Sequence, residues 1–328
     1  MRRAIERYLN RIWYGPSRPG IPLRILSGLY FKWWARRLTR PTARPQVPVI
    51  VVGNLTVGGG GKTPVVIALA RHLQKSGIQV AVISRGYGGS EPIEPERVPP
   101  EGDPGHFGDE PIEIAQSSGV VVWVCRSRLA ALKAAVSAGA EAVIADDGLQ
   151  HGALPRSFEI CVVDGVRGLG NRQLLPAGPM RQPLSRIGTV DQVMIKGGQW
   201  HWPRALRYSL ESVAITSLDG TEQQPVEDYS GMEVDAACGI AHPDSFFRML
   251  SETGMRIRQH RIHADHHDYQ TGDLAGLKGP VMVTAKDAVK LARLDLGVDV
   301  RVVRVEAGIP QSFLERLDEH VQEFSRGQ

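Results

Sequence analysis

Short apolar runs alternate with longer segments of helical periodicity from residue 49 to the end of the chain. This order is typical of a parallel sheet whose strands are joined by helices. In the first half, strands are expected at residues 49–52, 79–84, 120–124, 142–145 and 159–163, and helices at 62–75, 110–116 and 129–138. In the second half, strands are expected at 192–195, 212–216, 236–240, 281–284 and 299–305, and helices at 243–253, 287–294 and from Pro310.

A stretch rich in Gly, Pro and Glu interrupts this pattern at residues 86–108 and has no period of its own. Structureless segments of this length are uncommon inside compact domains unless they serve a function. We interpret the stretch as a long functional loop or a mobile lid.

The first 44 residues differ from the rest in charge. They hold eleven Lys and Arg residues against one acid, Glu6, which is a net charge of +10 and leaves −6 on the rest of a chain whose total is +4. A basic segment on an acidic body indicates an anionic partner at one end, either a phospholipid surface or a nucleic acid.

Residues 22–38 of this basic segment have the pattern of an amphipathic helix. At 100° per residue, its apolar arc comprises Ile25, Leu26, Leu29, Tyr30 and Trp33. Gly28 weakens the helix, and Arg36 and Arg37 fall inside the arc. Aromatic and basic residues on one short helix suit a bilayer interface better than an extended arm that reads phosphates, so nucleic acid is not the expected partner. The alternative is a helix that packs on its own domain with its charged face in solvent.

The three cysteines, Cys125, Cys161 and Cys238, are far apart and lie in apolar strand-like contexts. They are expected to be buried thiols in a reducing cytosol. The sequence has neither a signal-peptide pattern nor an apolar run of membrane-spanning length. The expected location is therefore the cytosol, with peripheral contact to a membrane.

A glycine-rich segment, VGGGGKTP at residues 57–64, stands between the first expected strand and the first helix. Its glycines let backbone N–H groups point at a phosphate, helped by the positive end of the following helix. Lys62 is expected to reach the β and γ phosphates of a nucleotide, and Thr63 to bind Mg²⁺. Thr56 stands at the first Walker A position, where glycine is usual. The expected nucleotide-binding residues are Thr56, Val57, Gly58, Gly59, Gly60, Gly61, Lys62 and Thr63.

An acidic doublet ends the expected strand at 142–145. A P-loop needs a second acid for its metal, and Asp146 is the expected ligand. Asp147, Gln150 and His151 follow at the carboxyl end of this strand, where open α/β sheets bind ligands. The chain is therefore predicted to be a phosphotransfer enzyme of the α/β class. Its predicted parts are a basic helical arm at 1–44, a P-loop NTPase-like parallel sheet with helices on both faces at 45–188, and a second, smaller α/β domain at 189–328.

Two further motifs are ambiguous on their own. Asp109 lies where a loop enters an expected helix, so it could be no more than a helix N-cap. The segment DHHDY, residues 265–269, resembles a metal cluster, but its adjacent histidines lack the i, i+4 spacing of a helical zinc site. A single histidine that acts as a base, or a simple polar loop, is the favoured interpretation.

Together the motifs are more specific than any one of them. The chain reads GNLTVGGGGKTP at 53–64, SRGYG at 84–88, GDEP at 108–111, ADDGLQH at 145–151, GNRQLLPAGPMRQPLSR at 170–186, DHHDY at 265–269 and TAKDAVK at 284–290. In this order they resemble the tetraacyldisaccharide 4′-kinases, the lipid A 4′-kinases of Gram-negative bacteria. The resemblance runs from the basic arm to the penultimate strand.

The resemblance implies transfer of the ATP γ-phosphate to the 4′-hydroxyl of a tetraacylated glucosamine disaccharide 1-phosphate, which forms lipid IVA. This acceptor stays in the bilayer, so the enzyme is expected at the cytoplasmic face of the inner membrane. Anionic lipids would attract the basic arm by roughly 1 kcal/mol per well-placed Lys or Arg. A monomer is expected.

The resemblance also implies roles for individual residues. Asp109 and His266 look like a general-base dyad, the aspartate from the first lobe and the histidine from the second, so that lobe closure would complete the site. Glu110 would share Mg²⁺ with Thr63 and Asp146. Asp147 would orient the reacting hydroxyl or the metal shell, and Lys62 would act in transfer. Arg85 or Arg128 could hold the 1-phosphate. The candidate contacts with sugar and phosphate are Arg85, Tyr87, Arg128, Gln150, His151 and Asn171.

Three positions depart from the family pattern: Arg172 replaces the usual glycine, Gln182 the glutamate of REP, and Ala285 the glutamate of TEKD. Roles that the family assigns to those two glutamates are therefore not carried over to this chain. Two other readings stay open from sequence. One is a regulatory or metal-insertion NTPase whose arm holds a protein partner, and the other is a nucleic-acid tether.

Overall fold

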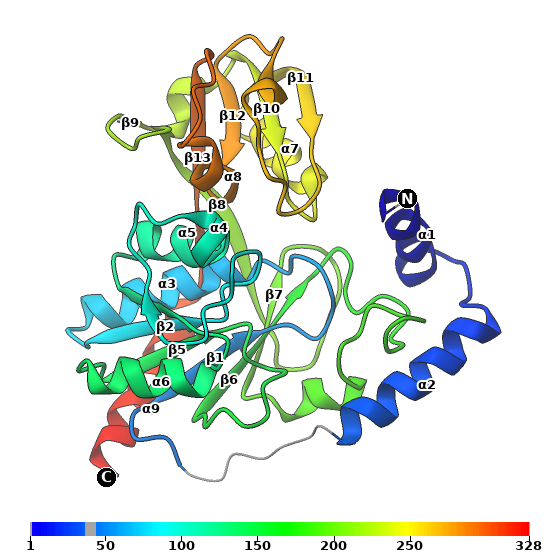
Figure 1. Ribbon diagram of the computed structural model, residues 1–328, viewed down its shortest axis with the longest axis vertical. Helices are drawn as coiled ribbons and strands as arrows, with labels where there is room; N and C mark the ends of the chain where they lie inside the picture. Colours follow the sequence, from blue (N-terminus) through cyan, green and yellow to red (C-terminus); the bar gives the residue numbers. More distant parts are fainter. Residues whose placement is uncertain (1, 37–43, 328) are drawn as a thin grey trace. The chain divides into compact units, whose positions relative to one another are not determined.

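The computed structural model describes residues 2–36 and 44–327. They form a mixed α/β protein with mostly parallel strands (Figure 1). The chain divides into two compact units. The first comprises Met1–Ser84, Arg128–Ser209 and Ile309–Gln328, and the second comprises Arg85–Ser127 and Leu210–Gly308.

This division differs from the predicted domain boundaries. The sequence placed single cuts after residues 44 and 188, whereas residues 85–127 belong with the second unit and the C-terminal helix with the first. Hydrophobic periodicity predicts each element by itself. It does not reveal which elements, distant in the chain, pack together.

The first unit contains a parallel sheet in the order β8-β7-β6-β1-β5-β2. β1, VIVVG, is buried along its whole length, as expected for a strand inside a parallel sheet. Helices α3 and α6 pack on these strands and α9 packs on α3. The strands are β1 (Val49–Gly53), β2 (Val80–Ser84), β5 (Ala142–Asp146), β6 (Phe158–Asp164), β7 (Gln192–Lys196) and β8 (Leu206–Ser217), of which β8 belongs to the second unit from Leu210 onward. The helices are α3 (Lys62–Lys75), α6 (Arg128–Ser137), η1 (Leu184–Thr189) and α9 (Gln311–Arg326).

The second unit has its own parallel strands in the order β11-β10-β12-β13, with α7 against β10 and β11 (Figure 1). Helix α5 packs on α8 and on β4. Apolar clusters lie around Phe246 and around Leu291. The strands are β3 (Glu96–Arg97), β4 (Val121–Val124), β9 (Gln223–Gln224), β10 (Glu233–Cys238), β11 (Arg256–Ile262), β12 (Val281–Thr284) and β13 (Val300–Gly308). The helices are α4 (Pro104–Phe107), α5 (Asp109–Ser118), η2 (Val226–Tyr229), α7 (Pro243–Glu252), η3 (Thr271–Leu274) and α8 (Ala285–Leu291).

All the strands and helices predicted from residue 49 onward are present, most within two residues of their expected ends. β11 was missed because its sequence, RIRQHRI, is largely polar and the strand is mostly exposed. The expected structureless stretch at 86–108 contains β3 and α4, and β3 pairs with β4.

The basic arm folds as two helices, α1 (Arg2–Tyr14) and α2 (Ile21–Arg36), where the sequence predicted one. Trp13, Ser27 and Tyr30 each donate a side-chain hydrogen bond to a main-chain carbonyl in residues 174–181, at 2.6–2.9 Å. Arg37 and Leu38 of the predicted helix lie outside the described residues. Among the described residues, no helix is long and apolar enough to cross a bilayer.

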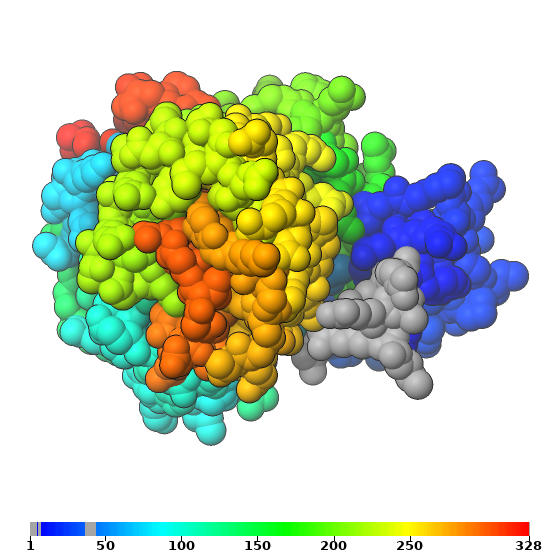
Figure 2. Space-filling model, turned by 90° about the horizontal axis from the view of Figure 1, so that it is seen from above, coloured from blue at the N-terminus to red at the C-terminus, as the bar shows by residue number. Residues whose placement is uncertain are grey.

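Most of the predicted apolar arc of α2 is not covered by the protein, whereas Tyr30 is half-buried. No residue of α2 is buried, and Ile25 and Leu29 are 62% and 57% exposed. Leu26 and Trp33 are also exposed, so the arm (blue in Figure 2) presents apolar side chains at the surface. This arrangement is unlike a helix that buries its apolar face on its own domain.

Candidate active site

The glycine-rich loop connects β1 to α3 in the first unit. Gly58 and Gly61 have φ values of 98° and 80°, a region that favours glycine, and a Cβ on Gly61 would lie 2.9 Å from the Tyr208 hydroxyl. Helix α3 begins at Lys62, and the N-cap Gly61 provides no side-chain hydrogen bond. The first N–H groups of α3 therefore follow a glycine turn without a side-chain cap, as in sites that bind phosphate.

The acidic doublet lies beside this loop because β5 pairs with β1, with Asp146 opposite Val52. Asp146 is buried and accepts a hydrogen bond from Ser84 Oγ at 3.3 Å. Asp147 Oδ1 lies 3.4 Å from Lys62 Nζ, and Asp147 Oδ2 lies 2.9 Å from Arg181 Nη1. Burial alone would raise the pKa of Asp147, but Lys62 and Arg181 hold it well below its usual range. Asp147 is therefore a carboxylate at neutral pH.

Two predicted substrate contacts instead support main chain near the doublet. The guanidinium of Arg128 is buried and donates to the carbonyl oxygens of Asp146 and Asp147, at 3.3 and 3.0 Å. Gln150 donates to the carbonyl of Asn54 at 2.6 Å. Arg128 thus fixes the loop after β5, and its contact with a phosphate stays a prediction.

Asn171 also bonds to main chain. Its Nδ2 donates to the carbonyls of Ala177 and Ile12, and its Oδ1 accepts from Gln173 N, so it ties α1 to residues 171–177. Its side chain is therefore engaged within the protein, and its contact with a sugar stays a prediction. His151 ends a turn in which its N–H donates to the Gly148 carbonyl at 3.0 Å, and its contact with substrate stays a prediction.

The structure gives physical reasons for two family departures. Arg172 has a φ of 59°, which explains why glycine is usual there and implies a strained backbone in this chain. Gln182 is buried and its amide donates to the Leu149 carbonyl at 3.4 Å, a bond that an ionised glutamate could not make. Ala285 is the buried first residue of α8, and nothing in the structure explains its substitution.

Asp109 and His266 are in contact within the second unit. Asp109 is buried at the first position of α5, after Gly108, so it is not the N-cap. His266 Nδ1 lies 3.0 Å from both carboxylate oxygens of Asp109. Burial would raise the pKa of Asp109, but the hydrogen bond from His266 and the charges of Lys286 and Lys290 hold it well below its usual range. An ionised carboxylate only accepts, so Nδ1 carries the proton and Nε2 is left as the basic atom.

Two lysines of α8 surround this pair. Lys286 Nζ lies 3.2 Å from His266 Nε2, 2.8 Å from Asp265 Oδ1 and 3.4 Å from Glu110 Oε1. Lys290 Nζ lies 3.1 Å from Asp109 Oδ2 and 3.0 Å from the carbonyl of His267. Burial opposes the charge on Lys286, but the carboxylates around it raise its pKa, so it is an ammonium. Neither lysine was predicted from the sequence to belong to the site, although their i, i+4 spacing in TAKDAVK places them on one helix face.

The contact between Asp109 and His266 corrects the predicted lobe closure. The aspartate was assigned to the first lobe and the histidine to the second, whereas both lie in the second unit and already touch. Helix α5 packs on α8, which brings the GDEP, DHHDY and TAKDAVK motifs together. No domain movement is needed to form the pair.

The other predicted site residues are divided between the two units. Tyr87 is 63% exposed and its ring meets the His266 ring edge-on, with centroids 5.3 Å apart. Arg85 forms an ion pair with Glu91 at 2.9 Å. Thr63 is the second residue of α3 in the first unit, whereas Glu110 belongs to the second unit. The role of each as a metal ligand stays a prediction.

Glu113, one turn after Glu110 on α5, gives a pH-dependent prediction. Burial, with a smaller contribution from Glu110, raises its pKa from 4.5 to about 8. Between these values the folded protein holds a proton that the unfolded chain has lost, so stability falls as pH rises, by about 1.4 kcal/mol per pH unit. Glu113→Gln removes this dependence, so its free energy of unfolding should rise relative to wild type between pH 5 and pH 8. Denaturant titrations would measure it, with the exposed Glu101→Gln as control. An equal difference at both pH values would contradict the assignment.

Comparisons with known proteins show the family and the fold. The family model described as LpxK, tetraacyldisaccharide-1-P 4′-kinase, matches residues 20–322. The tetraacyldisaccharide 4′-kinase of Alcanivorax borkumensis is 42% identical over 323 residues, which cover 96% of this chain and 97% of that protein. That of Hamiltonella defensa is 42% identical over 292 residues, 86% of this chain and 88% of that protein. The crystal structure of LpxK from Aquifex aeolicus in complex with ATP shares the fold, with a TM-score of 0.73, 24% identity and coverage of 92% and 97%. The chain therefore belongs to the tetraacyldisaccharide 4′-kinase family.

Proposed function

We propose that this chain acts as the tetraacyldisaccharide 4′-kinase of lipid A biosynthesis with Asp109 and His266 as the pair that deprotonates the acceptor. The reaction moves the γ-phosphoryl group of ATP to the 4′-hydroxyl oxygen, with ADP as the other product. The observation that carries the assignment of the base is the 3.0 Å contact between His266 Nδ1 and a buried, ionised Asp109.

The glycine-rich loop is proposed to hold the phosphates of ATP, as in a P-loop NTPase. Support comes from the positive φ values of Gly58 and Gly61 and from the start of α3 at Lys62. Lys62 is proposed to contact the β and γ phosphates, with Asp147 and Arg181 setting its position and local charge. Phosphoryl transfer needs mainly alignment and charge neutralisation, which these groups can supply.

A magnesium ion is proposed to accompany ATP. The hydroxyl of Thr63 and the carboxylates of Asp146 and Glu110 would hold it, and hard oxygen donors of this kind suit Mg²⁺. Asp146 fits because it is buried at the end of β5, in the strand next to the one that leads into the loop. When bound, the ion supplies positive charge that offsets the charge on the transferring phosphoryl group.

Proton removal is assigned to His266 Nε2. The Asp109 carboxylate fixes the tautomer with the proton on Nδ1 and stabilises the imidazolium that forms when Nε2 takes the hydroxyl proton. In this structure Lys286 Nζ lies 3.2 Å from His266 Nε2. The acceptor hydroxyl would replace Lys286 next to Nε2, while Lys286 keeps its hydrogen bond to Asp265. Tyr87, exposed beside His266, is proposed to contact the sugar, and Arg85 the 1-phosphate.

The arm is proposed to dock the enzyme on the inner membrane from its cytoplasmic side. Its polar contacts with residues 174–181 fix α2, while the apolar side chains stay exposed among basic ones. A short helix with this composition lies at the boundary between headgroups and acyl chains. The acceptor lipid is in that same surface.

Glutamates in the arm should uncouple membrane binding from catalysis. We expect Ile25→Glu/Leu29→Glu to lose cosedimentation with anionic vesicles, because two charges replace exposed apolar side chains. Turnover of substrate dispersed in detergent should stay near wild type. Ile93→Glu, which changes a 78% exposed residue of the second unit, is the matched control. Unchanged vesicle binding by the arm variant would remove α2 from the membrane contact.

Transfer of label tests the proposed function. Purified protein is incubated with ATP labelled in the γ-phosphate and with tetraacyldisaccharide 1-phosphate in mixed micelles. The label should move to the lipid. Hydrolysis of ATP without labelled lipid would instead support the regulatory NTPase.

A further inference from the structure

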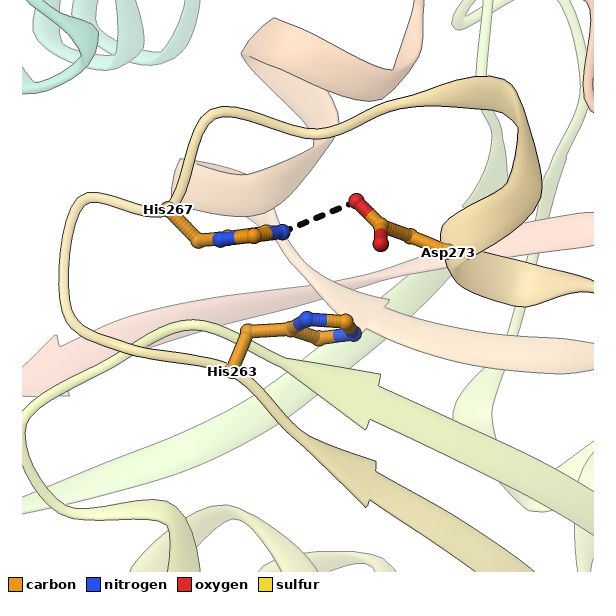
Figure 3. A group of neighbouring side chains, drawn as sticks. All are labelled: His263, His267 and Asp273. Atoms are coloured by element: carbon orange, nitrogen blue, oxygen red, sulfur yellow. Dashed lines mark hydrogen bonds and ion pairs between the residues drawn. The ribbon is translucent and has the colours of Figure 1, made fainter.

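We propose that His263, His267 and Asp273 form a binding site for one divalent transition-metal ion of the zinc class, separate from the proposed magnesium site. One potential ligand atom from each side chain lies within 4.8 Å of the others. His267 Nε2 is 2.8 Å from Asp273 Oδ2, and the two imidazole rings stack with centroids 4.5 Å apart and planes 21° apart. Figure 3 shows both rings extending toward the side on which Asp273 lies.

The backbone holds each of the three residues in place. His263 follows β11, and its N–H bonds the Cys238 carbonyl at the end of β10. His267 is held by its N–H to the Ala264 carbonyl and by Lys290 on its own carbonyl. Asp273 lies in η3, where its Oδ2 also accepts the N–H of Gln270 at 2.8 Å. A set of ligands held in this way loses little conformational freedom when an ion binds.

The chemistry of these side chains fits such an ion. Two imidazole nitrogens and one carboxylate oxygen are a usual protein ligand set for Zn²⁺, with water completing the shell. Burial opposes the ionisation of Asp273, but hydrogen bonds from Gln270 and His267 keep its pKa below the ordinary value, so it is available as an anion. His267 and Asp273 are 28% and 25% exposed, which leaves a path for the ion. The Tyr269 ring lies 5.0 Å from both imidazoles and walls one side.

This pair of histidines differs from the adjacent pair in DHHDY, which the sequence indicated as a possible metal cluster. His266 turns to Asp109, whereas His267 pairs with His263, four residues earlier in the chain but not on a helix. A bound ion would therefore tie together the ends of the segment that carries His266. It would replace the hydrogen bond between His267 Nε2 and Asp273, and the neutral imidazole would then carry its proton on Nδ1.

Cobalt and zinc titrations test the site. Tag-free protein is stripped with a chelator and titrated without nucleotide or lipid, with Co²⁺ followed by visible absorption and Zn²⁺ by calorimetry. We expect one equivalent to bind, with histidine-type cobalt bands. His263→Ala, His267→Ala and Asp273→Asn should each weaken binding by more than the ~10- to 100-fold that loss of an outer-shell partner costs.

His260→Ala is the matched control, since His260 lies on β11 and its ring contacts Phe247. Circular dichroism of each variant shows whether it is folded, and Asp273→Asn keeps the shape of the side chain. The proposal is overturned if wild type binds no Zn²⁺ at micromolar concentrations, or if the three variants bind as wild type or as the control does. No readout depends on kinase activity, so failure of this site and failure of the proposed function are distinguishable.

Discussion

His266→Ala and Asp109→Asn are each expected to lower kcat by about 10²–10⁴-fold, the usual contribution of a general base. His266 supplies the atom that takes the proton, and Asp109 fixes its tautomer through the 3.0 Å contact with Nδ1. Neither residue lies in the glycine-rich loop, so ATP affinity should stay near wild type. Single-turnover kinetics with saturating lipid would separate loss of chemistry from loss of binding.

The double variant makes this prediction sharper. The losses in kcat caused by mutating residues that act as one unit do not multiply. The double variant His266→Ala/Asp109→Asn should therefore have about the same kcat as the slower of the two single variants. Asp268→Asn, an exposed change in the same DHHDY segment, should have kcat close to wild type. Multiplicative losses in the double variant would mean that the two residues act separately.

Lys62→Met is the second change with a large expected effect. Lys62 is the first residue of α3, directly after the glycine turn, and its ammonium lies beside Asp147. It therefore places a positive charge at the uncapped start of the helix. Loss of a charge aimed at the transferring phosphoryl group should lower kcat by about 10²–10³-fold and also weaken ATP binding. Asp147 keeps Arg181 as a partner, so the variant should stay folded.

Lys75→Met is the matched control for Lys62→Met. Lys75 is exposed at the last position of the same helix, and its loss removes an equal charge far along α3. Its kcat should match wild type. A decrease of less than about tenfold in Lys62→Met would contradict the role assigned to this lysine.

Much of the fold followed from local pattern. Helix α3 has the predicted bounds because the glycines and Lys62 mark its start, and β1 and β5 follow from fully buried apolar runs. The proximity of Asp146 to the glycine-rich loop follows from parallel pairing of these two strands. These features depend on neighbouring residues, which is why the sequence predicts them.

The site in the second unit depends on residues distant in sequence. The family resemblance paired Asp109 with His266, but their membership in one unit and the positions of Lys286 and Lys290 follow from the packing of α5 on α8. The family resemblance made Arg128 and Asn171 candidates for substrate contact, and that contact stays a prediction. Their main-chain bonds depend on loop conformations that no periodicity encodes.

The position of the transferred phosphate tests the central claim most directly. Wild-type protein, ATP and tetraacyldisaccharide 1-phosphate are incubated, and the lipid product is analysed by phosphorus NMR and mass spectrometry. We predict a second phosphomonoester at the 4′ carbon, absent when the acceptor lacks the 4′-hydroxyl. A product that carries the new phosphate elsewhere, or unmodified lipid with ATP consumed, would contradict the account.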